Sequence, residues 1–148
     1  MEIRPIRPEE VPAALPLFAG YQEFYEQEDH QDQANLAFFT RFCEPSDAGL
    51  LLGAWDGDDL VGFATLYWTF SSTSAADIAL MNDLFVADRA RGKGFARALI
   101  EASAAAAKAR GCHALEWLTA PDNATAQRVY DKTGASRSEW YGYELPLQ

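Results

Sequence analysis

One short basic stretch, Arg89-Ala-Arg-Gly-Lys-Gly-Phe-Ala-Arg97, combines the residue types that bind a phosphorylated ligand. Gly92 and Gly94 permit sharp backbone turns that bring amide groups close to a ligand, and the positive end of the helix expected to follow points the same way. The stretch therefore predicts an anion site. Its glycine spacing matches neither G-x-x-x-x-G-K-[ST] nor G-x-G-x-x-G, which disfavours a nucleoside triphosphatase and a dinucleotide oxidoreductase.

Arg89, Gly92 and Gly94 form the pattern [RQ]-x-x-G-x-[GA], and Asn123, Ala126 and Tyr130 form the pattern N-x-x-A-x-x-hydrophobic-Y. A strand is expected between these two motifs. In this order they resemble the acetyl-CoA pyrophosphate loop and a later helix of the GNAT superfamily of N-acetyltransferases. The stretch NDLFV at 82–86 is similar to the E-D-L-[FY]-V strand of polyamine-type and related small-amine or protein acetyltransferases. The resemblance is specific from about residue 78 to residue 134.

The resemblance implies acetyl-CoA as the acetyl donor and no metal. The pantetheine arm would lie along the backbone of Leu84, Phe85 and Val86, and an amide near Phe85 or Val86 would hold the oxyanion. The pyrophosphate would be held mainly by backbone amides, with added charge from basic side chains, over Arg89, Arg91, Gly92, Lys93, Gly94, Phe95, Ala96 and Arg97. Asn123 would either bind the pantetheine end or cap its helix, a position that Asn favours.

Tyr130 is the proton donor that the resemblance implies. It follows Asn123 by about two helical turns and so shares its helix face. A phenol with a pKa near 10 can hydrogen-bond or protonate a leaving thiolate whose thiol has a pKa near 8.5. The alternative is a half-buried core tyrosine.

The acceptor needs a base, because a primary amine with a pKa of about 10.4 is protonated at neutral pH. Polyamine-type relatives commonly place a glutamate where this chain has Asn82, and an amide cannot accept the proton. We predict Asp83 as the base. Glu116, a water, or an amine that arrives neutral are alternatives, as is a purely structural Asp83. Asn82 and Asp83 point to opposite sheet faces unless a bulge intervenes.

Charge is distributed unevenly over the 148 residues, whose net charge is −10. Residues 1–88 carry −13 and residues 89–148 carry +3. An acidic and aromatic run ends the first expected helix and includes Tyr21, Glu23, Phe24, Tyr25, Glu26, Glu28, Asp29 and Asp32. Such a run would attract a cationic amine, or it is an ordinary solvated helix end. The predicted substrate contacts are Glu23, Tyr25, Glu26, Asn82 and Glu116.

The order of the expected strands and helices, which must position these residues, predicts a single α/β domain over residues 1–148. The resemblance implies a GNAT fold, with six to seven strands in a mixed sheet and about four helices. Strands are expected over Glu2–Arg7, Leu50–Trp55, Leu60–Phe70, Ile78–Val86 and Ala114–Thr119, with a pair in Ala135–Leu145. Helices are expected from Pro8 to Tyr25 and over Ala34–Cys43, Gly94–Arg110 and Asn123–Lys132. Small residues at Ala98, Ala102, Ala105 and Ala109 would dock the third helix on the sheet.

The sequence therefore predicts a cytoplasmic N-acetyltransferase, by analogy a homodimer, in which an amine attacks the thioester directly. A small cationic amine or polyamine is favoured, and an amino acid or a protein lysine is the alternative acceptor. The alternative outside the enzymes is a CoA-binding sensor or interaction module without catalytic activity. A nucleic-acid or membrane partner is not expected, because the overall charge is acidic.

Overall fold

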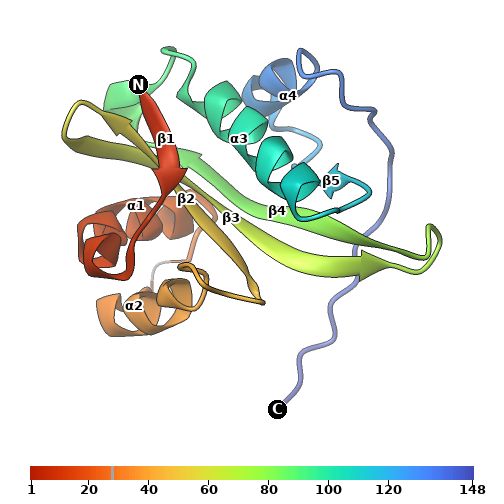
Figure 1. Ribbon diagram of the computed structural model, residues 1–148, viewed down its shortest axis with the longest axis horizontal. Coiled ribbons are helices and arrows are strands. Elements are labelled where there is room, and N and C mark those ends of the chain that lie inside the picture. The colour runs from red at the N-terminus through yellow and green to blue at the C-terminus, as the bar shows by residue number, and fades with distance from the viewer. Residues whose placement is uncertain (28) are drawn as a thin grey trace. The chain divides into compact units, whose positions relative to one another are not determined.

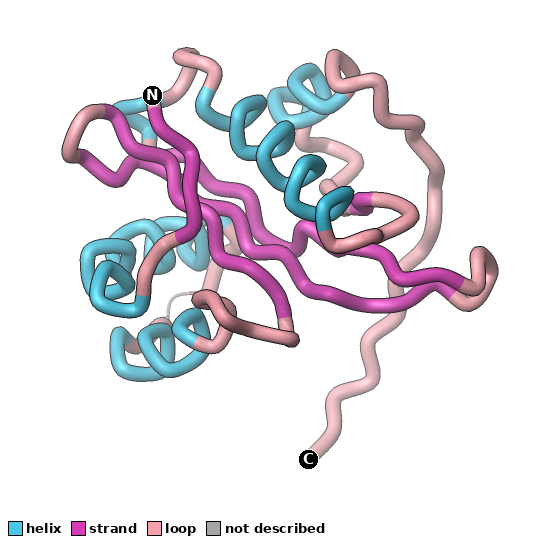
Figure 2. Tube along the Cα trace, viewed as in Figure 1, coloured by secondary structure: helices cyan, strands magenta, loops and turns pink. Residues whose placement is uncertain are grey.

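The computed structural model describes residues 1–27 and 29–148, and the chain divides into two units, Met1–Leu118 and Thr119–Gln148. A five-stranded sheet forms the centre of the first unit. The strands lie in chain order, namely β1 (Glu2–Pro5), β2 (Gly49–Asp56), β3 (Asp59–Ser71), β4 (Ala76–Val86) and β5 (Leu115–Glu116). The first four pair antiparallel, and β5 pairs parallel to β4. Figure 2 shows the long β3–β4 ribbon that carries the site. Glu28 lies outside the described residues.

Helices cover both faces of this sheet. Figure 1 shows α1 (Val11–Phe24) and α2 (Asp32–Thr40) on one face and α3 (Phe95–Ala109) on the other. Short 3-10 turns at Pro8–Glu10 and Asp88–Ala90 precede α1 and follow β4. The second unit contains α4 (Ala124–Tyr130). The predicted α/β class and the four helices are thus confirmed.

Aromatic packing joins the helix pair to the sheet. The Phe18 ring of α1 stacks on Phe39 of α2 with centroids 3.7 Å apart, and its edge meets Phe63 of β3 at 4.9 Å. All three rings are buried. Full burial of one such ring stabilises the fold by about 1.5–3 kcal/mol, so this contact fixes α1 and α2 over the middle of the sheet.

The alanine face predicted for α3 is not the one that docks. The buried residues of the helix are Phe95, Leu99, Ile100, Ser103 and Ala107, whereas Ala105 and Ala109 are exposed. Large apolar side chains gain more by burial than methyl groups do, so they select the docking face. The Ser103 hydroxyl donates to the Leu99 carbonyl at 2.7 Å, which satisfies the one polar group on that face.

The expected number of strands was too high. The strand predicted over 114–119 shortens to Leu115–Glu116, and no strand forms in the described residues 135–145. The aromatic residues of that segment favour a strand locally, but a strand is stable only within a ladder. Within the second unit, residues 119–148 as described contain no strand with which it pairs.

A carboxylate clamp joins β1 to the start of α1. Glu10 accepts hydrogen bonds from the guanidiniums of Arg4 at 2.9 Å and Arg7 at 2.8 Å, and from the Arg7 backbone amide at 2.9 Å. The hydrogen bonds from Arg4 and Arg7 lower the pKa of Glu10 well below its ordinary value. Because the folded-state pKa is lowered, this stabilisation is present above the ordinary glutamate pKa of about 4.3 and is lost as the pH falls below it.

Replacing Glu10 with Gln is therefore expected to reduce the free energy of unfolding by about 1–2 kcal/mol at pH 7. The difference from the parent should begin to shrink below about pH 4.3, since the unfolded parent then takes up a proton at Glu10 while the folded parent keeps this carboxylate ionised. Denaturant titrations at pH 7 and pH 3.5 measure it. Glu9→Gln is the matched control, because Glu9 is exposed and forms only a 3.6 Å ion pair with Arg7. A pH-independent loss would show that shape and not charge matters at Glu10.

Candidate functional site

A β-bulge in β4 brings two neighbouring polar side chains to one side of the sheet. Thr65 of β3 pairs with Asp83, and the next residue, Leu66, pairs with Met81, so Asn82 is the extra residue. Such a bulge interrupts the strict alternation of side chains. As a result both Asn82 and Asp83 line the same pocket. The bulge that the sequence left open is present.

This pocket, which we call the Asp83 pocket, has a volume of about 500 Å³ and lies between α1, α2 and the sheet. Its walls come from three sources, α1, α2 and the two central strands. The lining residues are Tyr21, Gln22, Ala34, Asn35, Phe38, Phe39, Tyr67, Asn82 and Asp83.

Asp83 is the buried ionisable group of the pocket, with 4% of its surface exposed. Burial raises its pKa above the ordinary aspartate value, and the neighbouring Tyr21, Thr65 and Asn82 side chains act in the opposite direction. The Asn82 amide donates to Asp83 Oδ1 at 3.0 Å. A carboxylate whose pKa is raised is a stronger base than an exposed one, so Asp83 is suited to take a proton from an ammonium group.

Tyrosines surround this carboxylate. The Tyr21 hydroxyl donates to the Asn82 carbonyl at 3.3 Å, and the Tyr21 and Tyr25 rings lie 5.0 Å apart. Burial and the nearby Asp83 raise the pKa of both residues, and the same causes raise the pKa of Tyr67 to about 12. These phenols therefore stay neutral over the physiological pH range and add no second negative charge.

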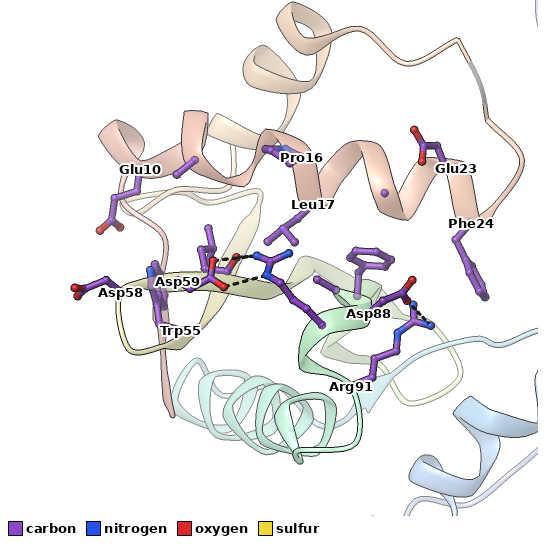
Figure 3. A pocket seen from close by; sticks show the side chains of 16 residues that line it. Glu10, Pro16, Leu17, Glu23, Phe24, Trp55, Asp58, Asp59, Asp88 and Arg91 are labelled. Carbon is purple, nitrogen blue, oxygen red and sulfur yellow. Dashed lines mark hydrogen bonds and ion pairs between the residues drawn. The ribbon is translucent and has the colours of Figure 1, made fainter.

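A second pocket, of about 910 Å³, lies beside α1 at the far end of β4. Figure 3 shows Pro16, Leu17 and Glu23 on its α1 side, with Asp58 in the β2–β3 turn and Asp59 at the start of β3. Gly20 keeps α1 close to β4, because a Cβ there would lie 3.1 Å from the Phe85 ring. Phe85 and Arg91 also line this pocket, so it begins beside the strand residues predicted to hold pantetheine.

The predicted anion loop has the backbone shape that its glycines suggested. Gly92 and Gly94 have φ values of 77° and 89°, in the left-handed region that favours glycine. Gly94 is the N-cap of α3 and provides no side-chain cap. The first amides of the helix, those of Phe95, Ala96 and Arg97, have no acceptor within it. The loop therefore offers backbone donors to an anion.

The basic side chains of the loop all have carboxylate partners. Arg89 donates to Asp59 at 2.9 and 3.0 Å, as the dashed lines in Figure 3 mark. The other three pairs are Arg91 with Asp88 at 3.0 Å, Lys93 with Asp56 at 3.6 Å and Arg97 with Glu101 at 2.9 Å. A ligand would compete for these cations, whereas the backbone amides are already oriented.

The second unit carries the other motif. Asn123 begins α4, where its Oδ1 accepts from the Ala126 amide at 3.2 Å, so the capping role is observed. Gln127 Nε2 donates to the Ala120 and Pro121 carbonyls at 3.1 and 2.9 Å and fixes the chain before the helix. Tyr130 is the last residue of α4.

The predicted substrate residues are only partly brought together. Asn82 lines the Asp83 pocket, and the Tyr25 ring, which does not line it, has its centroid 5.0 Å from that of the lining residue Tyr21. Glu23 lines the larger pocket and lies 3.1 Å from His30 Nε2, while Glu26 is exposed. Glu116 pairs with Leu80 in β5 and lines neither of these pockets.

Sequence reasoning missed several polar residues of the Asp83 pocket, chiefly Gln22 and Asn35. Their side-chain amides donate to each other at 2.8 and 2.9 Å, and Asn35 is buried. A signal was present, since Asn35 precedes the buried Phe39 by one helical turn and so lies on the apolar face of α2. Tyr67 was missed because it lies in a nearly continuous apolar strand.

Two negative findings apply to the described residues. No group of three or more His, Cys, Asp or Glu side chains among residues 1–27 and 29–148 is arranged to hold a metal ion. None of the helices in these ranges has both the length and the apolar character needed to cross a membrane.

Known proteins match the chain over most of its length. An uncharacterised N-acetyltransferase, YhfO of Bacillus subtilis (strain 168), is 35% identical over 134 residues, which cover 90% of this chain and 89% of that protein. The D-amino-acid N-acetyltransferase HPA3 of Saccharomyces cerevisiae is 33% identical over 132 residues, which cover 88% and 81%.

Solved structures share the fold. A probable acetyltransferase superposes with a TM-score of 0.86 and 27% identity over 100% of this chain and 99% of that one. An integron cassette protein from the mobile metagenome of V. cholerae has a TM-score of 0.78 and 28% identity over 97% and 91%. The sequence model described as the Acetyltransferase (GNAT) family matches residues 14–135. The chain therefore belongs to the GNAT family of acetyltransferases, as its motifs predicted.

Proposed function

We propose that the chain transfers the acetyl group of acetyl-CoA to a primary amine, in a direct attack by the amine on the thioester. The observation that carries this proposal is Asp83, a buried carboxylate in a pocket on the strand that leads into the amide-lined loop. A base and an anion site supplied by one strand and its following turn suit a reaction between a cation and a thioester of a diphosphate-bearing carrier.

The donor end is formed by β4 and the loop after it. Backbone groups of Leu84, Phe85 and Val86 would hold the pantetheine arm, and the amides between Gly92 and Arg97 would hold the pyrophosphate. The left-handed glycines support this assignment, because they orient amides without a side chain in the way. Arg89 would contribute mainly by fixing the loop to Asp59.

The acceptor end is the Asp83 pocket. The ammonium would lose one proton to Asp83, and the neutral nitrogen would form a bond to the thioester carbonyl carbon. The carbonyl oxygen would gain negative charge opposite an amide near Phe85 or Val86. As the carbonyl re-forms, the carbon–sulfur bond breaks and the thiolate takes a proton from Tyr130. The nitrogen then loses its second proton, which passes through solvent and reprotonates Tyr130. The products are an N-acetylated amine, CoA thiol and a proton released to water.

The acceptor proposed is a small cationic amine. An amino acid is the alternative suggested by the name of the yeast relative, a D-amino-acid N-acetyltransferase. The Asp83 carboxylate and the neighbouring aromatic rings support a cation in the pocket. A CoA-binding module without activity would bind the donor equally well but acetylate no amine.

Replacing Tyr130 with Phe tests the proposed chemistry. We expect kcat to fall about 100-fold while the Kd for CoA changes less than about threefold, because only the proton transfer to sulfur is lost. Thiol release from acetyl-CoA with an amine panel measures kcat, and calorimetry measures the Kd. Tyr143→Phe, an exposed tyrosine of the same unit, is the control. Tight CoA binding by the parent without turnover on any amine would support the idle module instead.

The remaining proposals concern the whole chain. We propose that residues 1–148 form one N-acetyltransferase domain, since the family match at 14–135 runs through the end of the first unit into the second. We also propose that the protein is a homodimer in the cytoplasm and has no nucleic-acid or membrane partner. The net charge of −10 supports the absence of such partners, because nucleic acids and anionic lipids repel an acidic protein.

A further inference from the structure

Four of the nine residues that line the Asp83 pocket are aromatic. Tyr21 lies on the α1 side, Phe38 and Phe39 on the α2 side, and Tyr67 on β3. Phe38 is 39% exposed and so lies at the outer edge, whereas Phe39 is buried against Phe18. Aromatic walls of this kind favour a flat or apolar body and can contact a cation through their faces.

Several polar groups of the pocket already have hydrogen-bond partners within the protein. The Gln22 and Asn35 amides satisfy each other, and Tyr21 donates to the Asn82 carbonyl. Asp83 has hydrogen-bond donors nearby but no cationic partner among the described lining residues. One ammonium group would therefore neutralise the pocket, and a second would find no second carboxylate in its lining.

No positive side chain lines the pocket within the described part of the chain. Arg41 does not line the pocket, but its guanidinium lies 5.4 Å from the ring of Phe38, which does, and 5.7 Å from the buried Phe42 ring. An acceptor with a carboxylate beside its amine would place that carboxylate close to Asp83. Like charges in a poorly hydrated pocket repel strongly, so such an acceptor is selected against.

Resting on the proposed function, we infer that the Asp83 pocket selects monoamines with an apolar, uncharged body, of the arylalkylamine type, over amino acids and polyamines. One carboxylate binds and deprotonates the single ammonium, and the aromatic side chains pack on the body. This assigns specificity to Phe38 and Tyr67, which no motif of the sequence marked.

The test compares three amines in the full chain with saturating acetyl-CoA. 2-Phenylethylamine and phenylalanine differ only by the carboxylate, and putrescine carries a second ammonium. We expect kcat/KM for 2-phenylethylamine to exceed that for either enantiomer of phenylalanine by about 100-fold, and that for putrescine by about 10-fold. Equal or better use of phenylalanine or putrescine overturns the inference while leaving acetyl transfer intact. Absence of turnover on every amine overturns the proposed function itself.

Two variants separate the pocket from a general effect. Phe38→Ala should raise KM for 2-phenylethylamine about 10-fold more than it raises KM for ethylamine, because ethylamine has no ring to pack on Phe38. Phe70→Ala, at an exposed ring on β3, is the matched control. If Phe38→Ala changes neither amine, the body does not lie in this pocket. If Arg41→Ala abolishes measurable phenylalanine acetylation, a carboxylate is recognised there and the inference is wrong.

Discussion

Asp83→Asn is expected to lower kcat/KM for amine acetylation by about 100-fold or more, because the amide cannot accept the ammonium proton. The same variant should unfold at a higher temperature than the parent. The pKa of Asp83 is raised by burial, so the folded chain opposes ionisation of this group. A neutral isostere removes that cost. A gain of about 1 kcal/mol, the scale of a poorly compensated buried polar group, corresponds to about 2–4 °C.

The pH dependence follows from the direction of the shift. Because the folded-state pKa of Asp83 is raised, the protonated form favours folding below the ordinary aspartate pKa of about 3.9, and this contribution is lost as the pH rises through the folded-state pKa. The stability advantage of Asp83→Asn should therefore be largest at neutral pH and vanish in acid. In kcat/KM, the parent should show an acid limb above pH 3.9 that the variant lacks.

The measurements are melting curves and initial rates between about pH 4 and pH 9, the range in which the two effects differ. Asp77→Asn is the matched control, since Asp77 lies on the same strand but is exposed. A variant that loses stability, or that retains the parent's rate and acid limb, would contradict the base assignment. Lost activity together with gained stability is difficult to attribute to misfolding.

Gly92→Val is expected to lower the affinity for CoA by about 100-fold with little effect on folding. A left-handed residue with a branched Cβ costs about 1–2 kcal/mol, and the loop would relax to another φ and turn its amides away. Apart from Gly92 and its two neighbours in the chain, no atom lies within 4 Å of a Cβ built at Gly92, so the cost is local backbone strain and not a clash with the rest of the fold.

Calorimetric titration with CoA measures this effect, and a melting curve reports on folding. Gly111→Val is the control, because Gly111 also has a positive φ, 88°, with no atom near its Cβ, but lies at the opposite end of α3. Its backbone strain should be similar and its CoA affinity unchanged. Equal loss in both variants would mean that strain in general, and not the direction of the loop amides, weakens binding.

The local signals in the sequence predicted the parts of the molecule that depend on local conformation. Gly92 and Gly94 indicated the left-handed loop, Asn123 indicated the start of α4, and both are present. The bulge at Asn82 could be stated only as a condition, since it depends on how β3 pairs with β4. The Gln22–Asn35 contact joins two helices across thirteen positions of sequence and leaves no periodic trace.

Tertiary competition explains the errors. The alanine stripe of α3 had the correct helical spacing, but Phe95 and Leu99 bury more apolar surface and decide the docking face. The residues 135–145 have local strand propensity but no ladder partner within their unit. Spacing therefore predicted the four helices and the first four strands, and the size of the side chains decided how α3 packs.

The extra residue in β4 reverses the parity of the strand. The β3 residues Phe63, Thr65 and Tyr67 face α1 and α2. Before the bulge, the even-numbered Leu80 pairs with this set, and after it the odd-numbered Asp83 and Phe85 do. If the strand were regular, Asp83 would point into the apolar layer beneath α3, where an ionised carboxylate is prohibitively unfavourable. Asp83, the proposed base, therefore also favours the bulge that turns it toward α1 and α2. Deletion of Asn82 would make β4 regular and would leave Asp83 paired with Thr65, whereas a substitution keeps the number of residues in the strand unchanged.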